Sequence, residues 1–159
     1  MAGDEQTPTL RFRAATTAGL AAIVRLLADD GLGATRERYA DPPPTAYRDA
    51  FAAMQAQGGN DHILAELDGE FAGCLPLTVI PGLSRLGMRR AQIEGVRVDR
   101  RFRGSCVGAA LFRHAIDRAR AAGCGLVQLT TGKARPEALR FYERLGFAAS
   151  HEGLKLALE

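Results

Sequence analysis

A turn rich in small residues opens a helix in the second half of the chain. The run 103–109 reads Arg-Gly-Ser-Cys-Val-Gly-Ala, and it follows the strand-like segment 93–98. Backbone N–H groups at the start of a helix have no intrahelical acceptor, and they carry a partial positive charge. The glycines let a ligand approach the backbone closely. We therefore expect this turn to bind an anionic group such as a pyrophosphate.

Two common nucleotide-binding motifs do not fit this turn. A P-loop ends in Gly-Lys-Ser/Thr, but here Gly108 is followed by Ala109 and Ala110. A dinucleotide fingerprint needs Gly-x-Gly-x-x-Gly, and the spacing from Gly104 to Gly108 does not provide it. The turn belongs to another class of anion site.

A second segment accompanies the turn. Residues 138–147 read Ala-Leu-Arg-Phe-Tyr-Glu-Arg-Leu-Gly-Phe, a helix with a Phe-Tyr pair that ends in Leu-Gly-Phe. In their order and separation, the two segments resemble the GNAT N-acetyltransferase superfamily. Its acyl-CoA loop has the signature Arg/Gln-x-x-Gly-x-Gly/Ala, in which Cys106 replaces the middle glycine. The resemblance covers the chain from Leu10 onward in outline and residues 92–147 in detail.

The resemblance implies a fold and a cosubstrate. The fold is α/β, with a central mixed sheet flanked by helices on both sides, in one acetyltransferase domain over residues 10–159 after a flexible N-terminus, 1–9. The cosubstrate is acetyl-CoA. In the family the central strand splays from its neighbour at a bulge, and the pantetheine arm pairs with the exposed backbone, here at Val96, Arg97 and Val98. The pyrophosphate would be held by Arg103, Gly104, Ser105, Cys106, Val107, Gly108 and Ala109.

Arg135 stands where many family members have an asparagine that contacts pantetheine. With Lys133 it forms a small basic cluster before the last helix. This cluster suits a CoA phosphate, and it equally suits a solvated surface pair.

Glu94 is the candidate general base. It shares strand parity with Val96 and Val98, unless a bulge resets the alternation, so its carboxylate is expected to face an apolar layer. A carboxylate there must be hydrogen-bonded or must have a raised pKa, which suits a base. Family members often place a base at this position, acting on the substrate ammonium through water. The alternative is a structural carboxylate bound to loop N–H groups or to an arginine.

Tyr142 is the candidate general acid. Adjacent helix residues point about 100° apart, so Phe141 and Tyr142 can serve the core and the cofactor separately. By the resemblance, the phenol protonates the departing thiolate. The alternative is a second core aromatic whose hydroxyl is satisfied locally.

The backbone angle φ of Cys106 decides between two interpretations of this residue. With a positive φ, a residue other than glycine costs about 1–2 kcal/mol; with a negative φ, the amide still donates and little is lost. A thiol near a helix N-terminus has features of a reactive group. A tolerated small residue is the simpler interpretation.

The elements that must position these residues follow from periodicity and turn signals. Alternation and apolar runs predict strands at 10–13, 62–67, 70–80, 91–98, 126–131 and 154–158, with a hairpin at Asp68-Gly69. Helical spacing predicts helices at about 16–28, at 45–57, from the glycine turn to 121, and at 136–145. Their buried faces are expected to carry Leu20, Ile23, Val24 and Leu27 in the first helix, and Leu111, Ala115, Ile116 and Ala119 in the third.

Composition limits the function classes. The 159 residues carry a net charge of +3 and 47% hydrophobic residues, an ordinary globular composition that does not favour nucleic-acid binding. Three cysteines without a Cys-x-x-Cys pair favour a reducing compartment, and no signal peptide or membrane span is visible, so we expect a cytoplasmic protein. The histidines His62, His114 and His151 show no ligand spacing, and no metal is expected.

The resulting hypothesis is an enzyme that transfers acetyl from acetyl-CoA to a primary amine of a small molecule or peptide, by direct attack in a ternary complex. Cys106 as an acyl-carrying nucleophile is the mechanistic rival. A non-catalytic acyl-CoA-binding regulatory module is the alternative of another class, against which Glu94 and Tyr142 argue. Homodimers are common in the family. The acceptor region contains arginines at positions 36, 38, 85, 89 and 90. They suit an anionic acceptor, and the alternative is that they are solvated loop charges.

Overall fold

The computed structural model of the protein describes residues 8–31 and 33–158. Its strands are β1 (Leu10–Ala14), β2 (Asn60–Leu67), β3 (Glu70–Ile80), β4 (Arg89–Ile93), β5 (Arg97–Val98) and β6 (Cys124–Leu129). Its helices are η1 (Thr17–Gly19), α1 (Leu20–Ala28), α2 (Gly33–Arg36), α3 (Thr45–Gln57), α4 (Ser84–Gly87), η2 (Arg100–Phe102), α5 (Val107–Ala121) and α6 (Pro136–Arg144). None of the described helices is long and apolar enough to span a bilayer.

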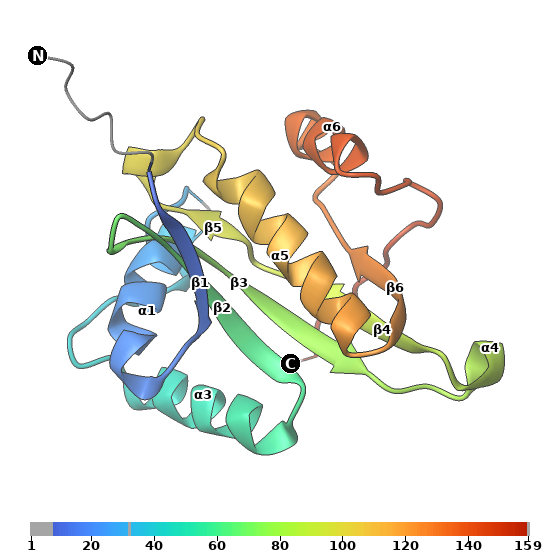
Figure 1. Ribbon diagram of the computed structural model, residues 1–159. Helices are drawn as coiled ribbons and strands as arrows, with labels where there is room; N and C mark the ends of the chain where they lie inside the picture. The colour runs from blue at the N-terminus through green and yellow to red at the C-terminus, as the bar shows by residue number, and fades with distance from the viewer. Residues whose placement is uncertain (1–7, 32, 159) are drawn as a thin grey trace, which may run out of the picture.

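The strands form one mixed sheet in the order β1-β2-β3-β4-β6, with β5 paired to β3 in line with β4 (Figure 1). All pairs are antiparallel except β4 and β6, which are parallel. The predicted hairpin turns at Asp68 and Gly69, both with positive φ. Of the expected flexible segment 1–9, only Pro8 and Thr9 are described. The N–H of Thr9 donates to Asp68 Oδ1 at 2.8 Å.

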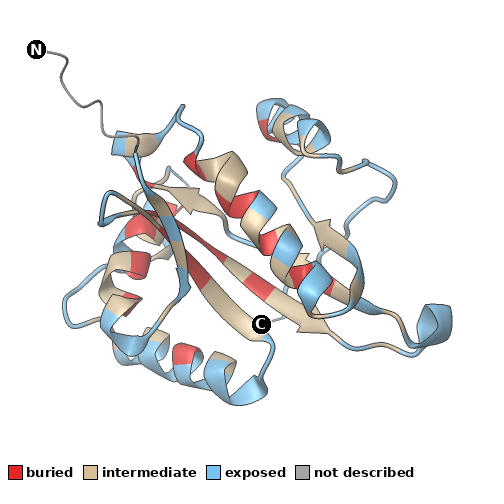
Figure 2. Ribbon diagram, in the orientation of Figure 1, coloured by how far each residue is buried: buried red, intermediate tan, exposed pale blue. Residues whose placement is uncertain are grey.

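Helices cover both faces of the sheet, as expected from the resemblance. Ile63 and Ala65 of β2 pack in a core cluster with α5, whereas Leu64 between them packs with α1. Successive strand residues point to opposite faces, so α5 lies on one face and α1 on the other. Figure 2 shows the buried residues of α5 and α1 turned toward the sheet, with α3 mostly exposed.

Two buried positions differ from those that the helical spacing predicts. In α5 the largest buried side chain is Phe112, whereas the predicted Ile116 is only partly buried. The ring of Phe112 meets Phe141, Tyr142 and Phe147 at centroid distances of 5.4–6.2 Å. The buried face of α5 therefore extends to Phe112 through an aromatic contact with α6 that the spacing alone does not reveal. In α1, Leu26 is buried and Leu27 is only partly so.

The predicted closing strand at 154–158 is wrong. The structure assigns no strand to this segment, and Leu154, Leu156 and Leu158 are 94%, 85% and 89% exposed. Alternation marks the segment as able to form a strand, but a strand also needs a neighbour to supply its hydrogen bonds. Within the described residues, none pairs with it.

Asp99 is the buried charged residue of the described chain, at 4% exposure. Its Oδ1 accepts hydrogen bonds from the backbone N–H of Arg101 at 3.0 Å and from Arg101 Nε at 3.2 Å. Its Oδ2 accepts one from Arg25 of α1 at 3.2 Å. The hydrogen bonds from Arg101 are the main cause that lowers the pKa of Asp99 to about 2, against the opposing effect of burial. Asp99 thus joins α1 to the loop that leads into α5.

We predict that Asp99→Asn lowers the free energy of unfolding at pH 7 by about 2 kcal/mol. Because the folded pKa lies below the ordinary value of 3.8, the carboxylate stabilises the fold above pH 4. This contribution is lost as the pH falls from about 4 to 2. Urea unfolding at several pH values measures it.

The matched control is Asp117→Asn, whose ion pair with Arg120 is exposed. It should change stability by less than about 0.5 kcal/mol. A difference between Asp99→Asn and the wild type that stayed undiminished at pH 2 would contradict the assignment.

Candidate active site

The central strand is interrupted by a bulge. Leu77 of β3 pairs with Ile93, and Cys74 pairs with Arg97, so the two residues 75 and 76 face the three residues 94–96. The prediction of a continuous strand over 91–98 is therefore wrong, whereas the bulge implied by the resemblance is present.

Pro76 supplies the physical reason for the bulge. Its carbonyl oxygen accepts from the N–H of Glu94 at 3.4 Å, so its nitrogen side also faces the 94–96 segment. Proline has no N–H, and a ladder hydrogen bond is missing there. Gly95 adopts a φ of +54°, which is favourable for glycine and accommodates the extra residue.

β5 lies beyond the end of β6. β6 pairs with Arg89–Ile93 of β4 and ends at Leu129, opposite Ile93, and no described strand pairs with the far side of β5. The N–H of Asp99 donates to Ala72 of β3 at 2.8 Å, and backbone groups alternate along a strand, so those of Val98 point away from β3. An exposed backbone edge therefore begins where the bulge ends.

Arginine side chains contact the carbonyls of this edge. Arg103 Nε donates to the Val98 oxygen at 3.2 Å, and Arg97 Nη1 donates to the Val96 oxygen at 3.0 Å. A carbonyl oxygen has two lone pairs, so each can accept a further bond. The edge can pair with an extended amide-bearing chain.

The turn before α5 has the backbone that an anion site needs. Gly104 has a φ of +76°, and the Ser105 hydroxyl donates to the Phe102 carbonyl oxygen. The N–H of Val107 donates to Ser105 Oγ at 3.4 Å, and that of Ala110 donates to the Cys106 oxygen at 2.9 Å.

The first turn of α5 leaves donors for a ligand. Gly108 and Ala109 lie within this turn, where N–H groups have no intrahelical acceptor. The turn contains no acidic residue, and the preceding segment 103–106 is exposed. The free N–H groups and the positive end of the helix dipole fit a pyrophosphate.

Cys106 does not strain this turn. Its φ is −74° and its ψ is −4°, in the ordinary right-handed region. The glycine that needs a positive φ is Gly104, which the chain retains. Cys106 is exposed, and its side chain makes no capping hydrogen bond. The missing middle glycine of the signature therefore leaves the backbone path intact.

Glu94 lies in the bulge and is exposed, so the expectation that it faces an apolar layer is wrong. The bulge resets the alternation on which that expectation rested. Its side chain makes no hydrogen bond or ion pair with any described residue. The carboxylate is accessible beside the exposed backbone edge.

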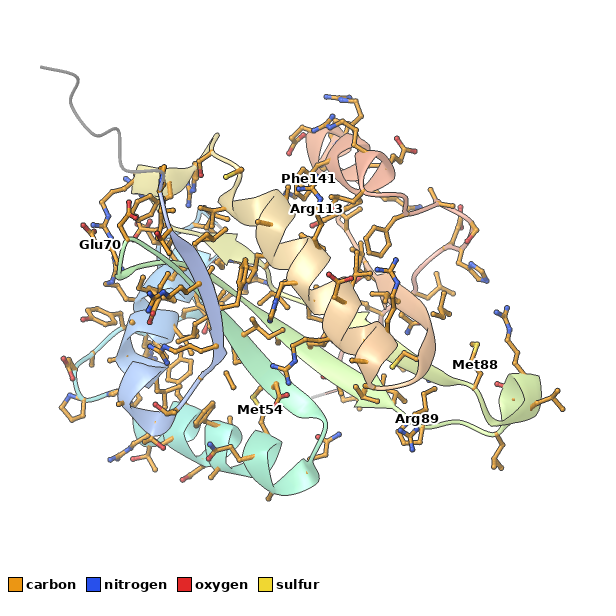
Figure 3. The ribbon with its side chains drawn as sticks, in the orientation of Figure 1. Met54, Glu70, Met88, Arg89, Arg113 and Phe141 are labelled. Carbon is orange, nitrogen blue, oxygen red and sulfur yellow. The ribbon has the colours of Figure 1, made fainter. Side chains whose placement is uncertain are left out.

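Tyr142 is half-buried in an aromatic cluster on α6. Its ring lies 5.4 Å from that of Phe112 and 6.2 Å from that of Phe147, by centroids. Figure 3 shows Phe141 in the space between α5 and α6. Burial raises the pKa of the Tyr142 phenol, and the positive charges of Arg135 and Arg97 oppose this shift. The phenol therefore keeps its proton at neutral pH, and it lies within electrostatic reach of Arg97 on β5.

Arg135 is exposed at the N-cap of α6, with its Nε 3.8 Å from Glu137. A pair that is this long and exposed is weak, so the guanidinium can turn to another anion. Arg97 instead forms a 2.9 Å ion pair with Asp30, after α1. Within the described residues, no group of three His, Cys, Asp or Glu side chains comes together as metal ligands.

Sequence reasoning missed two residues that shape this site. Pro76 lies where the ladder hydrogen bond is missing, and Asp99 fixes the loop before the turn. A proline within a predicted strand was the available signal for the first. Asp99 depends on its contact with Arg25 of α1, a distant segment, and no local pattern marks it. Arg103 was expected at the pyrophosphate, and its side chain donates to the Val98 oxygen.

Comparison with known proteins identifies a family and relatives that the chain resembles. The pattern of the acetyltransferase (GNAT) family matches residues 22–147. Glucosamine 6-phosphate N-acetyltransferase of Trypanosoma brucei brucei is 34% identical over 90 residues, which are 57% of this chain and 59% of that enzyme. Aminoalkylphosphonate N-acetyltransferase of Salmonella typhimurium is 34% identical over 106 residues, 67% of this chain and 68% of that enzyme.

A solved structure agrees over nearly the whole length. The crystal structure of a protein described as a transcriptional regulator, from Bacillus halodurans C-125, superposes with a TM-score of 0.90 at 47% identity, and it covers 94% of this chain and 100% of that one. The family match over residues 22–147 shows that the chain belongs to the GNAT acetyltransferase family.

Proposed function

We propose that the protein is an acetyl-CoA-dependent N-acetyltransferase that acts on a primary amine by direct transfer in a ternary complex. The observation that carries the proposal is the juxtaposition, after one bulge, of an unpaired backbone edge at β5 and free N–H groups at the start of α5. The backbone edge suits the amide-bearing pantetheine arm, and the free N–H groups suit the pyrophosphate.

Each candidate site residue has a chemical role in this proposal. Acetyl-CoA supplies an acetyl group activated as a thioester. The 103–109 turn binds the pyrophosphate, and the backbone of Val96 and Val98 orients the pantetheine arm. Glu94 takes a proton from the substrate ammonium through water. Tyr142 donates its phenolic proton to the departing sulfur, and its raised pKa keeps that proton in place at neutral pH.

The two named relatives suggest a finer substrate class. Their names specify glucosamine 6-phosphate and aminoalkylphosphonates, which share an amine and a phosphorus oxyanion. We infer a small amine with a phosphate or phosphonate group as the acceptor. The net charge of +3 favours an anionic substrate, and turnover across a panel of matched amines with and without the oxyanion tests this.

A non-catalytic acyl-CoA-binding regulator is the second candidate. The description of the Bacillus halodurans protein favours it. Tight acetyl-CoA binding without thiol release on any amine of the panel would support it over the enzyme.

Tyr142→Phe should lower kcat by about 100-fold and leave the Kd for acetyl-CoA within about twofold, because only the acidic proton is removed. Thiol release and calorimetry measure the two quantities. Tyr39→Phe is the matched control, since Tyr39 is 50% exposed and outside the aromatic cluster, and it should retain full activity. Equal rates for Tyr142→Phe and the wild type would rule out the acid role.

Glu94→Gln should lower kcat/KM by 10-fold or more near neutral pH, and the loss should shrink at higher pH, where the amine deprotonates without help. The pH profile of acetyl transfer measures this. Glu143→Gln, at an exposed position on α6, serves as the control. A loss that stayed constant across the profile would indicate a structural carboxylate instead.

Gly104→Ala should weaken acetyl-CoA binding by roughly 10-fold, because its φ of +76° costs a residue with a Cβ about 1–2 kcal/mol. Cys106→Ala should bind and turn over normally, because the Cys106 backbone is unstrained. Calorimetry with CoA compares the two variants. Loss of turnover in Cys106→Ala, with an acetylated wild-type protein detected by mass spectrometry before acceptor is added, would favour the covalent route.

A further inference from the structure

A row of uncharged polar side chains crosses the sheet on the face opposite α5, which we call the α1 face. Thr78 of β3 pairs with Gln92 of β4, and Gln92 pairs with Gln128 of β6. Leu77 and Ile93, the strand neighbours of Thr78 and Gln92, pack with α5, so the row lies on the α1 face. Its three side chains are half-buried. Figure 1 shows α1 and α3 against the other half of the sheet, away from β4 and β6.

The row keeps hydrogen-bonding capacity for a ligand. Gln128 Nε2 donates to Gln92 Oε1 at 2.7 Å, and Gln92 Nε2 donates to the Ile93 oxygen at 3.5 Å. The Thr78 hydroxyl donates to Asn60 Oδ1 at 3.2 Å. An amide group has two N–H donors and an oxygen with two lone pairs, so both glutamines can still donate and accept. Neutral groups that do both are suited to the hydroxyl groups of a ligand.

His62 lies in the next row of the same face, at the level of the bulge. It pairs with Pro76, whose carbonyl oxygen accepts from Glu94 in the bulge. Leu64, two residues further along β2, packs with α1, so His62 shares its face. His62 Nε2 is buried and has no hydrogen-bond partner among the described residues. Such an atom calls for a ligand atom or an ordered water. Burial lowers the pKa of His62 to about 4, so the imidazole is neutral at neutral pH.

Arg90 extends this face on the other side of Gln92. It precedes Gln92 by two residues on β4, so it lies on the same face and about 7 Å away along the strand. The residues opposite it are the apolar Ile80 and Leu126. Its side chain is half-buried and forms no ion pair with any described residue. A guanidinium in this setting can pair with an oxyanion.

The order of these groups along the central strand matches the parts of one molecule. In the proposed function, Glu94 takes the proton of the acceptor amine at the bulge. Gln92 and Arg90 follow at successive positions of the α1 face, so a molecule whose amine lies at the bulge can extend over both. α5 covers the other face, which leaves the α1 face for this extension.

We propose that the α1 face of β2, β3 and β4 binds the acceptor, that Gln92 and His62 hydrogen-bond to its hydroxyl groups, and that Arg90 pairs with its oxyanion. The inference rests on the proposed function. It adds hydroxyl groups to the phosphate-bearing or phosphonate-bearing amine, and it assigns the residues that select each group.

Four amines separate the two elements of recognition. Glucosamine 6-phosphate carries hydroxyl groups and a phosphate, and glucosamine carries hydroxyl groups alone. Aminoethylphosphonate carries an oxyanion alone, and cyclohexylamine carries neither. Thiol release should give the highest kcat/KM for glucosamine 6-phosphate and a value at least about 10-fold lower when either element is missing. A wild type that acetylates these amines without regard to their hydroxyl groups overturns the proposal.

Substitutions should remove the two preferences separately. Arg90→Met should lower kcat/KM by about 10- to 100-fold for the two amines with an oxyanion and leave glucosamine within about twofold. Gln92→Leu should lower it by about 10-fold for the two hydroxylated amines and leave aminoethylphosphonate within about twofold. Arg89→Met is the matched control, because Arg89 Nη1 donates to the Ala122 oxygen after α5 at 3.2 Å. It should keep the wild-type pattern. Losses that are equal for all four amines would indicate a structural role and overturn the proposal.

His62 is tested by a pair of variants. His62→Phe removes Nε2 and should lower kcat/KM for glucosamine by about 10-fold. His62→Gln, whose amide nitrogen can take the position of Nε2, should recover most of this loss. Full activity in His62→Phe, or an equal loss in the two variants, contradicts the role of His62.

Binding separates this inference from the proposed function. Calorimetry with CoA present measures the Kd of glucosamine 6-phosphate without turnover. If no amine is acetylated, the enzyme proposal fails, and a Kd that Arg90→Met raises by at least about 10-fold still supports the binding surface. If acetylation proceeds and Arg90→Met and Gln92→Leu leave both Kd and kcat/KM unchanged, the proposed function stands and the binding surface is overturned.

Discussion

A missing hydrogen-bond donor at Pro76 is the constraint on which the site depends. A regular β3 would hold 91–98 in one continuous strand along its length, whereas β6 ends at Leu129, opposite Ile93. Proline removes the N–H that would face this strand, and Gly95 takes up the extra residue with a positive φ. The bulge thereby shifts β5, whose outer backbone edge has no partner among the described strands.

The open edge needs support, because unpaired backbone alone would leave the loop after it free to move. Asp99 supplies that support from a buried position. Its carboxylate holds the backbone of Arg101 and contacts Arg25 of α1, while Arg100 pairs with Asp29 at 2.8 Å. These contacts fix the start of the turn against the helix on the opposite face of the sheet. Buried charges persist only when they are well paired, and here the paired charge holds the loop that leads into α5.

The aromatic cluster around Phe112 connects α5 with α6. Phe112, Phe141 and Phe147 surround Tyr142 edge to face, an arrangement that stabilises aromatic pairs beyond their buried area. The same packing removes water from the phenol and raises its pKa. The same contacts thus fix the position of α6 and the pKa of the Tyr142 phenol, so a substitution in the cluster changes both.

The sequence by itself determined the order of the main helices and strands from β1 to α6, the glycine turn at the start of α5 and the Phe-Tyr helix, because periodicity, capping glycines and turn residues are local properties of the chain. It also indicated the family through two short segments. The tertiary structure decided the features that depend on contacts between distant segments. The bulge moved Glu94 out to solvent, Phe112 replaced Ile116 on the buried face of α5, and residues 154–158 have a strand pattern without a strand partner. Strand pairing and side-chain burial are properties of two segments at once, and no pattern within one segment specifies the other.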